Sequence, residues 1–176
     1  MEVIGIRRGY NGLINGDVFE MNARSVSSII QRGGTLLFTA RCPEFKEEAG
    51  IMKAVETCKR IGIEGLVVIG GDGSYRGAGD LSAHGIPCIG IPGTIDNDIA
   101  STEATIGFDT AMNTVVQLVD KLRDTSESHS RCTVVEVMGR HAGDIALQTS
   151  IALGAVTAVI KEIPTDFDHV IEKMVA

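Results

Sequence analysis

The amino-acid sequence predicts an α/β fold of three layers, in which helices cover a mainly parallel β-sheet. Short β-branched runs alternate along the chain with longer segments of helical spacing, which is the pattern of βαβ units. The 176 residues include 21 glycines and only 4% aromatic residues, as in turn-rich folds packed from aliphatic side chains. In such folds ligands bind at the loops that follow the strands, so functional residues are expected there.

Several short runs are predicted to be strands because they are rich in β-branched residues and are bounded by turn residues. Most are expected to be buried on both faces, as is usual in a parallel sheet. The predicted strands are Glu2 to Ile6, Thr35 to Phe38, Gly65 to Ile69, Pro87 to Ile91, Cys132 to Val137 and Ala158 to Ile160.

Between these runs, apolar residues recur at helical spacing, for example Met52, Val55 and Cys58. The predicted helices are Ser25 to Gln31, Glu47 to Arg60, Tyr75 to His84, Gly107 to Arg123, Ala142 to Leu153 and, at the end of the chain, Asp168 to Ala176.

The stretch from Gly93 to Gly107 is the longest predicted loop, and the helix that follows can carry the chain into a second lobe. We therefore expect a boundary near Gly107. This divides the chain into lobes at 1–107 and 108–176.

The formal net charge of −7 argues against binding to nucleic acids or acidic membranes, since both require a basic surface. The four cysteines form no C-x-x-C pair, which is typical of a protein of the reducing cytosol. No apolar run is long enough for a transmembrane helix, and the first residues do not resemble a secretory signal. We therefore expect a soluble, cytoplasmic protein.

The first candidate site is the turn GGDGS at residues 70–74, which follows a predicted buried strand and begins a helix. Its glycines allow a polyphosphate to approach the backbone, and the N–H groups at a helix start attract anions. Asp72 would then hold Mg²⁺, directly or through water. The alternative is an ordinary tight turn in which Asp72 only caps the helix.

The second candidate site is the loop PGTIDND at residues 92–98, again after a predicted strand. One of its two carboxylates, Asp96 and Asp98, can accept a proton from a substrate hydroxyl while the other helps to organise metal and water. Repulsion between them would tune their pKa values. The alternative is a turn in which the Asn and Asp side chains bond their own backbone.

The third candidate site is VVEVMGRHAG at residues 134–143, where a predicted strand delivers Arg140 to a helix start. A guanidinium there can bind a phosphoryl group through two hydrogen bonds and neutralise charge that develops during its transfer. The alternatives are a surface salt bridge for Arg140, an ordinary first-turn position for His141 and a packing role for Met138.

In this order, GGDGS, PGTIDND and VEVMGRHAGD make the chain resemble the bacterial-type ATP-dependent 6-phosphofructokinases, and the match runs through nearly all of it. The resemblance implies transfer of the γ-phosphoryl group of ATP to the 1-hydroxyl of fructose 6-phosphate in glycolysis, with Mg²⁺. Further matching segments are GYNGL at 9–13, RGGT at 32–35, ARCPEF at 40–45 and LRDT at 122–125.

The resemblance gives five polar residues of the three sites a role in the transfer. Asp96 matches the catalytic base, and Asp72 matches the carboxylate associated with Mg²⁺. Thr94 and Asp98 would support the substrate and the phosphoryl group in transfer, and Arg140 would stabilise its charge.

The resemblance also implies two binding sites. In the sugar site, Met138 and Gly139 would line the pocket, and Arg131 would reach the 6-phosphate bound by a neighbouring subunit of a homotetramer. The residues that match the family's ATP site are Tyr10, Arg41, Cys42, Phe45, Gly73, Ser74 and Gly77; Arg41 would also stabilise charge in transfer.

Glycine at positions 73 and 93 favours ATP as the donor, because pyrophosphate-dependent relatives carry Asp and Lys there. A pyrophosphate-dependent enzyme remains an alternative, as does a noncatalytic fragment or assembly module. NAD kinases and diacylglycerol kinases also contain a GGDG turn, but PGTIDND and MGR argue against them.

The sequence departs from the family pattern at both ends and at the effector site. No GGDAPGMN-like loop precedes Met1, and groups that bind fructose 6-phosphate are expected beyond Ala176, so this chain alone is expected to have negligible kinase activity. Arg123 matches an effector-site residue, but Ala23 and Val156 replace an Arg and an acidic residue usual there.

Overall fold

The computed structural model of the chain describes residues 1–175, which leaves only the last residue of the predicted helix Asp168 to Ala176 outside the description. The chain divides into two compact units. The first unit comprises Met1–Val68 and Gly73–Gly90, and the second comprises Ile69–Asp72 and the chain from Ile91 onward. The predicted lobe boundary near Gly107 falls inside the second unit and stays a prediction about the lobes.

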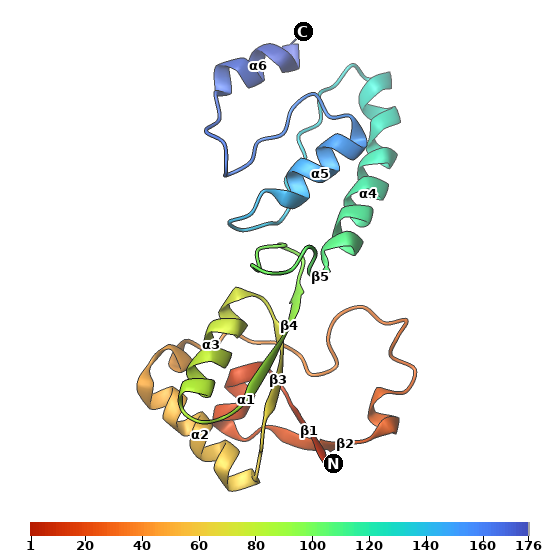
Figure 1. The fold of residues 1–176 in the computed structure, drawn as a ribbon. Coiled ribbons are helices and arrows are strands. Elements are labelled where there is room, and N and C mark those ends of the chain that lie inside the picture. Colours follow the sequence, from red (N-terminus) through yellow and green to blue (C-terminus); the bar gives the residue numbers. More distant parts are fainter. Residues whose placement is uncertain (176) are drawn as a thin grey trace. The chain divides into compact units, whose positions relative to one another are not determined.

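The first unit contains a small antiparallel hairpin and a group of helices (Figure 1). Strands β1 and β2 pair so that Ile4 lies opposite Glu20. The elements are β1 (Val3–Ile6), α1 (Gly9–Asn15), β2 (Val18–Met21), the 3₁₀ turns η1 (Ala23–Val26) and η2 (Pro43–Lys46), α2 (Glu48–Ile61), β3 (Leu66–Gly70), α3 (Asp72–Ala83) and β4 (Cys88–Thr94). The ends of β3 and β4 and the first residue of α3 belong to the second unit.

Helix α2 supplies most of the core of the first unit. Its charged residues stabilise the helix dipole, because Glu48 lies in the first turn and basic residues lie in the last. The helix is capped at its C-terminus by Gly62, whose φ of 81° favours glycine. Truncating a buried core residue of this kind to alanine costs about 2–5 kcal/mol. The buried cluster comprises Leu13, Phe45, Ile51, Ala54, Val55, Cys58, Leu81 and Ile86.

Strands β3 and β4 belong to a three-stranded sheet in the order β3-β4-β5, where β5 is Ile106–Gly107. The pairing of β4 with β5 is parallel, with Gly93 opposite Ile106, which agrees with the predicted α/β class. The expectation of strands buried on both faces is wrong, because alternate residues on β3 and β4 are open to solvent: Val67 is 63% exposed, Ile69 64% and Ile89 68%.

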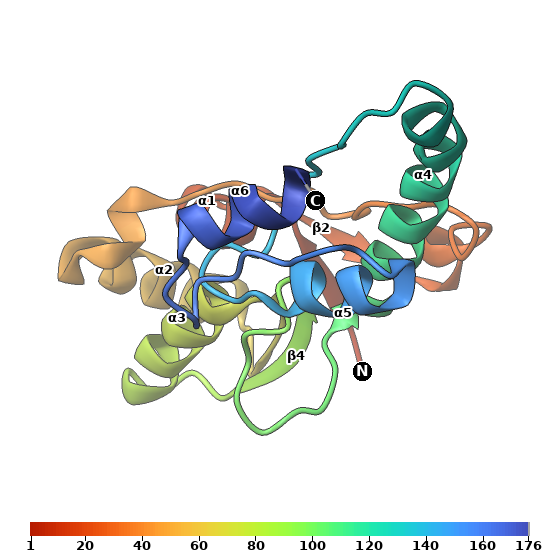
Figure 2. The same ribbon diagram turned by 90° about the horizontal axis from the view of Figure 1, so that it is seen from above.

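The second unit contains two long packed helices, α4 (Phe108–Ser128) and α5 (Asp144–Leu153), and the short α6 (Phe167–Val175). Helices α4 and α5 lie side by side (Figures 1 and 2). A guanidinium N–H of Arg123 donates to the carbonyl oxygen of Leu153, so this side chain ties α4 to the end of α5. In the described part of the chain, no helix has the length and apolar character needed to cross a membrane.

The helices and the strands near residues 3–6, 66–70 and 88–94 confirm most of the predicted elements, with shifts of a few residues at their ends. Three predicted strands do not form: Thr35 to Phe38, Cys132 to Val137 and Ala158 to Ile160. Their β-branched composition predicts strands, but a strand requires a neighbour to pair with, and none pairs with them in residues 1–175.

The predicted helix Ser25 to Gln31 is reduced to the 3₁₀ turn η1. Polar side chains take over the backbone groups that a helix would use: Asn22 and Ser25 form a reciprocal capping box, and the Ser27 hydroxyl donates to the Arg24 carbonyl at 2.8 Å. Helix α1 and strands β2 and β5 were not predicted, because each is short and glycines interrupt or flank α1 and β5.

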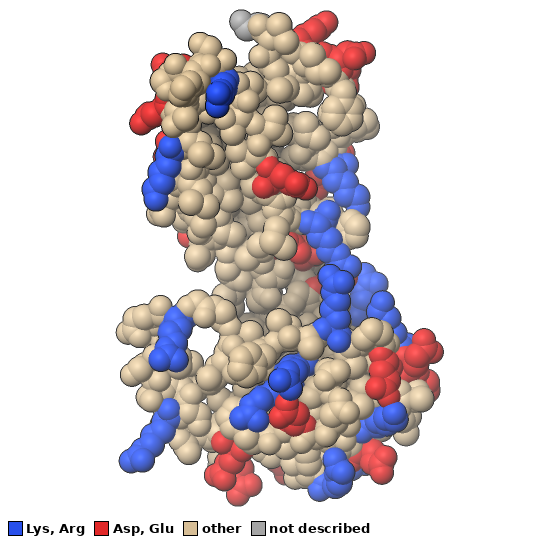
Figure 3. Space-filling model, turned by 180° about the vertical axis from the view of Figure 1, so that it is seen from behind, with Lys and Arg blue, Asp and Glu red and all other residues tan. Residues whose placement is uncertain are grey.

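Acidic and basic side chains are mixed over the first unit on the face shown in Figure 3. One ion pair of this unit joins two helices. The Nδ1 atom of His84, just after α3, lies 2.7 Å from the Asp80 carbonyl oxygen, and its Nε2 atom lies 2.9 Å from Oε1 of Glu48 on α2. Both partners are acceptors, so the ring must be doubly protonated to make both bonds. The bond to the Asp80 carbonyl is the main cause that raises the pKa of His84, followed by the Glu48 carboxylate.

We predict that His84 stabilises the protein in a pH-dependent way. Its stabilisation is complete below the unfolded pKa of about 6.5 and is lost as pH rises through the higher folded-state pKa. The difference in Tm between the wild-type chain and His84→Gln should therefore shrink from pH 6 to pH 9. Because the site is exposed, the difference should be small. A pH-independent difference would show that His84 stays neutral.

Candidate active site

The loop after β4 is organised by its own polar groups. The backbone N–H of Asp96 donates to Oγ1 of Thr94 at 3.2 Å, and Asn97 has a left-handed φ of 55°. The Asn97 side chain accepts a hydrogen bond from the Thr105 N–H at 3.0 Å, which ties the loop back to the residues before β5. The turn-forming alternative therefore describes Asn97 correctly, and it leaves the carboxylate of Asp96 available for another task.

Asp96 is half-buried, and its electrostatic surroundings include two other predicted site residues. Burial is the main cause that raises the pKa of Asp96, and the negative charge of Asp98 raises it further. The positive charge of Arg140 opposes this shift. Asp98, from the same loop, and Arg140, from a separate motif, are thus both within electrostatic reach of Asp96.

Arg140 lies in a tight turn between residue 139 and the start of α5. Its own φ is 54° and that of Gly139 is 154°, both in the left-handed half of the backbone map. A side chain at the buried Gly139 would place its Cβ 2.3 Å from the Ala142 carbonyl oxygen, so glycine is required there. The turn is closed by a 2.8 Å hydrogen bond from the Ala142 N–H to the Gly139 carbonyl.

Asp72 stands close to the same loop. A Cβ at Gly71 would lie 3.4 Å from Cβ of Thr94, and one at Gly93 would lie 2.9 Å from Cγ2 of Ile69, so the ends of β3 and β4 approach closely. Asp72 follows directly as the half-buried first residue of α3. The sites predicted around Asp72 and Asp96 are therefore neighbours within the second unit.

Four of the residues predicted to bind a nucleotide meet in the first unit. The ring of Tyr10 stacks on Phe45, with centroids 4.1 Å apart and planes 8° from parallel, and its hydroxyl donates to the Ser74 carbonyl at 2.5 Å. Gly77 is buried against both rings, where a Cβ would be 2.6 Å from Tyr10. Burial is the main cause that raises the pKa of the Tyr10 hydroxyl, so it remains a hydrogen-bond donor.

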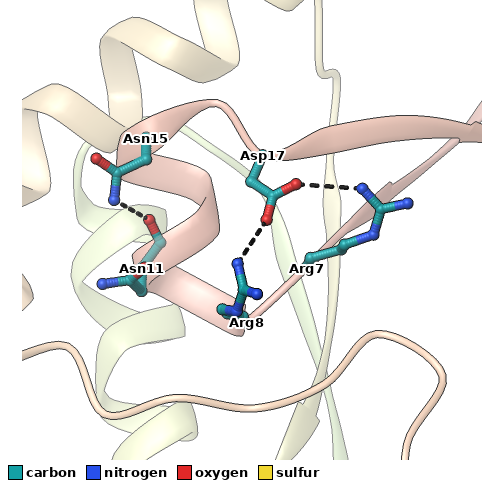
Figure 4. A network of polar contacts seen from close by, with 5 residues as sticks. All are labelled: Arg7, Arg8, Asn11, Asn15 and Asp17. Carbon is teal, nitrogen blue, oxygen red and sulfur yellow. Dashed lines mark hydrogen bonds and ion pairs between the residues drawn. The ribbon is translucent and has the colours of Figure 1, made fainter.

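The start of α1, which carries Tyr10, is held by a polar network (Figure 4). The carboxylate of Asp17 accepts from Arg7 at 3.3 Å and from Arg8 at 3.2 Å. Arg8 precedes the helix with a left-handed φ of 58°, and its backbone N–H donates to the Leu37 carbonyl at 2.8 Å. These contacts fix the direction in which α1 leaves the hairpin.

The remaining predicted residues lie elsewhere. Cys42 precedes η2 and packs partly against the core, whereas Arg41 and Gly73 are exposed. In the second unit Met138 is 74% exposed, Arg131 is exposed after α4, and Arg123 is engaged with Leu153 and Asp120. Sequence reasoning gave no role to Asn97 beyond a turn, and it did not single out Glu162, whose carboxylate accepts a 2.7 Å hydrogen bond from the Gly143 N–H after the Arg140 turn.

The chain was compared with known proteins. The family model described as Phosphofructokinase matches residues 1–176. The chain belongs to the phosphofructokinase family. This confirms the predicted family and fold class, and it removes support from the reading as an NAD kinase or a diacylglycerol kinase.

Curated relatives and solved structures agree with the family match. The ATP-dependent 6-phosphofructokinase of Shouchella clausii is 60% identical over 97% of this chain and 54% of that protein, and the protein of the same name from Bacillus velezensis is 58% identical over 99% and 54%. The T-state crystal structure of Pichia pastoris phosphofructokinase matches with a TM-score of 0.80 and 38% identity, over 88% of this chain and 18% of that one. The chain thus spans about half the length of the curated relatives it matches.

A Mg²⁺ ion at the predicted site would have one carboxylate of this chain as a ligand, that of Asp72. Residues 1–175 contain no group of three or more His, Cys, Asp and Glu side chains that could form a metal cage. Mg²⁺ usually keeps several waters and binds one or two carboxylates together with phosphate oxygens. Asp72, half-buried at the start of α3 and beside Thr94, can supply such a carboxylate.

We predict opposite shifts in the pKa of Asp96 when its two charged neighbours are removed. Arg140→Met should raise this pKa, because the cation that favours the ionised form is lost, and Asp98→Asn should lower it, because a like charge is lost. Carbon-13 NMR titration of the Asp96 carboxyl group would measure both. Asp168→Asn, on α6, serves as a control and should leave the titration unchanged. Shifts of the same sign in both variants would contradict the arrangement described above.

Proposed function

We propose that the chain forms the phosphoryl-transfer half of an ATP-dependent 6-phosphofructokinase, which moves the γ-phosphoryl group of ATP to the 1-hydroxyl of fructose 6-phosphate in glycolysis. The observation that carries the proposal is the loop after β4 in a chain of the phosphofructokinase family: the Thr94 hydroxyl holds the Asp96 N–H, and Asp98 and Arg140 lie within electrostatic reach of Asp96. Curated relatives with 58–60% identity carry the name ATP-dependent 6-phosphofructokinase.

In this proposal Asp96 is the general base. Its Oδ atom takes the proton from the sugar's 1-hydroxyl as that oxygen attacks phosphorus. Partial burial and the charge of Asp98 raise the pKa of Asp96, which makes its carboxylate a stronger base. Thr94 and Asp98 orient the substrate in the same loop, and the Thr94 hydroxyl already fixes the backbone N–H of Asp96.

Arg140 supplies the positive charge of the site. Phosphoryl transfer depends on positioning and on neutralising charge at the equatorial oxygens, and a guanidinium does both through paired hydrogen bonds. Asp72 would hold Mg²⁺, which when bound neutralises the phosphates of ATP. Met138 and Gly139, beside Arg140 in the chain, would line the sugar site.

The nucleotide would bind at the first unit, where Tyr10, Phe45, Ser74 and Gly77 already lie together. Tyr10 and Phe45 offer stacked aromatic surface. Arg41, Cys42 and Gly73 would complete this site, and Arg41 would also share in charge stabilisation.

Glycine at position 93 also favours ATP over pyrophosphate. A Cβ at Gly93 would lie 2.9 Å from Cγ2 of Ile69, so a lysine there would force the Ile69 side chain to move. A pyrophosphate-dependent enzyme therefore fits less well. A noncatalytic assembly module also fits less well, since Asp72, Asp96 and Arg140 are all retained.

The wider arrangement also belongs to the proposal. The lobes 1–107 and 108–176 would bind ATP and fructose 6-phosphate respectively, and Arg131 would reach the 6-phosphate of a neighbouring subunit in a cytoplasmic homotetramer. Arg123 would belong to an effector site, although its contact with Leu153 gives it a structural task as well. Because the chain spans 54% of its relatives' length, we propose that it has negligible activity alone.

The proposal predicts that the chain works when the rest of a relative is supplied. A chimera in which these 176 residues replace the matching part of the Bacillus velezensis protein, to which 174 of them align, should form fructose 1,6-bisphosphate. Asp96→Asn in the chimera should lower kcat by a factor of about 10²–10⁴, since it removes a general base. Asp168→Asn is the matched control and should leave kcat unchanged. An Asp96→Asn chimera of full activity would refute the role of Asp96.

The same chimera tests the donor and the metal. We predict faster turnover with ATP than with pyrophosphate, and loss of turnover when EDTA removes Mg²⁺, with recovery when Mg²⁺ is restored. Asp72→Asn should raise the Mg²⁺ concentration needed for half-maximal rate. If pyrophosphate proved the better donor, the assignment of ATP would be wrong.

A further inference from the structure

The turn that carries Arg140 adopts a backbone conformation that needs support from outside. A non-glycine residue with a φ of 54° is uncommon, and the preceding Gly139, at 154°, adopts a conformation open mainly to glycine. The single hydrogen bond within the turn, from the Ala142 N–H to the Gly139 carbonyl, does not fix where the turn points. A later segment, residues 160–162, supplies the contacts that do.

Glu162 is the central residue of that segment. Its Oε1 accepts a hydrogen bond of 2.7 Å from the backbone N–H of Gly143, the residue that caps the start of α5. The N-cap residue Gly143 has no side chain that could cap the helix, so this carboxylate, 19 positions along the chain, adds to the negative charge of Asp144 in the first turn. The bond to Gly143 is the main cause that lowers the pKa of Glu162.

The residues beside Glu162 also contact the turn and the residue that follows it. Nζ of Lys161 lies 3.0 Å from Nδ1 of His141, directly after Arg140. A Cβ at Gly143 would lie 2.5 Å from Oε2 of Glu162 and 2.6 Å from Cβ of Ile160, so the segment closes on the turn only because residue 143 is glycine. The turn is therefore held at His141 and at Gly143.

We propose that Glu162 is a positioning residue for phosphoryl transfer: by holding the Gly143 N–H it fixes the turn that aims Arg140 at the Asp96 site. This inference rests on the proposed function for its catalytic consequence. Its hydrogen bond is to the backbone N–H of Gly143, so Glu162 would act on Arg140 through the backbone of the turn. Because the carboxylate is exposed, the bond should contribute little to global stability, and its effect should show in geometry.

The position of Arg140 can be read in the 176-residue chain itself, without any activity, from the titration of Asp96. In Glu162→Ala the turn loses its partner, the influence of Arg140 weakens and the pKa of Asp96 should rise. Loss of the negative charge of Glu162 by itself would change this pKa in the opposite direction, so the sign separates the two causes. Glu162→Gln keeps an acceptor for the Gly143 N–H and should not raise the pKa.

Two further variants complete the design. Gly143→Ala keeps the charge of Glu162 but pushes its carboxylate away, so it should raise the pKa of Asp96 as Glu162→Ala does. Glu172→Gln removes a carboxylate from α6, where it pairs with His169 at 3.8 Å, and should change nothing. An unchanged or lowered pKa in both Glu162→Ala and Gly143→Ala would overturn the proposal.

The catalytic consequence is measured in the chimera described above. Glu162→Ala should lower kcat about tenfold or more with little change in the KM for ATP, and Glu162→Gln should recover most of the loss. An unchanged kcat in Glu162→Ala would overturn the positioning role. A chimera that is inactive in every form would instead refute the proposed function, and the titration in the chain alone would still decide whether Glu162 positions Arg140.

Discussion

The candidate site depends on the balance of charge around the Asp96 carboxylate. The carboxylate of Asp98 and the guanidinium of Arg140 act on it in opposite directions. Asp96 and Asp98 stand two residues apart on the loop after β4, and their repulsion favours a proton on Asp96. Arg140, from a turn more than forty positions later, opposes that effect. In its proposed role as general base, Asp96 must be ionised at neutral pH and yet basic enough to take a hydroxyl proton, and the two opposing influences suit both requirements.

Glycines allow the close approaches of the chain around the candidate site. Gly71 and Gly93 let the ends of β3 and β4 approach until Thr94 lies beside the start of α3, and Gly139 lets the Arg140 turn close on itself. Near Tyr10 a glycine also allows close packing, because Gly77 has no side chain and so leaves room for the stacked rings. In each case a methyl group would meet an atom at van der Waals distance or closer, so the glycine content noted in the sequence reflects close approach as much as turns.

Sequence reasoning predicted the parts of this arrangement that are local. Asp72, Asp96 and Arg140 could be named because each follows a strand-like run, and short-range pattern fixes which residues a turn contains. It failed where the outcome depends on a distant partner. Residues 132–137 have the composition of a strand but no pairing neighbour in the described chain. Val67 and Ile69 were expected to be buried, but their side chains face solvent. Glu162 carried no signal at all, since a single glutamate after a β-branched run is typical of a surface.

The Arg140 turn explains why such a residue is needed. Backbone strain at a left-handed non-glycine position amounts to about 1–2 kcal/mol, and the turn itself contributes one hydrogen bond in return. A local segment with so little support would sample several conformations, and a guanidinium on it would neutralise charge only part of the time. The contacts of Lys161 with His141 and of Glu162 with Gly143 restrict that sampling on the side of the turn that follows Arg140. The arginine can then be exposed, as access to a substrate requires, and still hold a defined place.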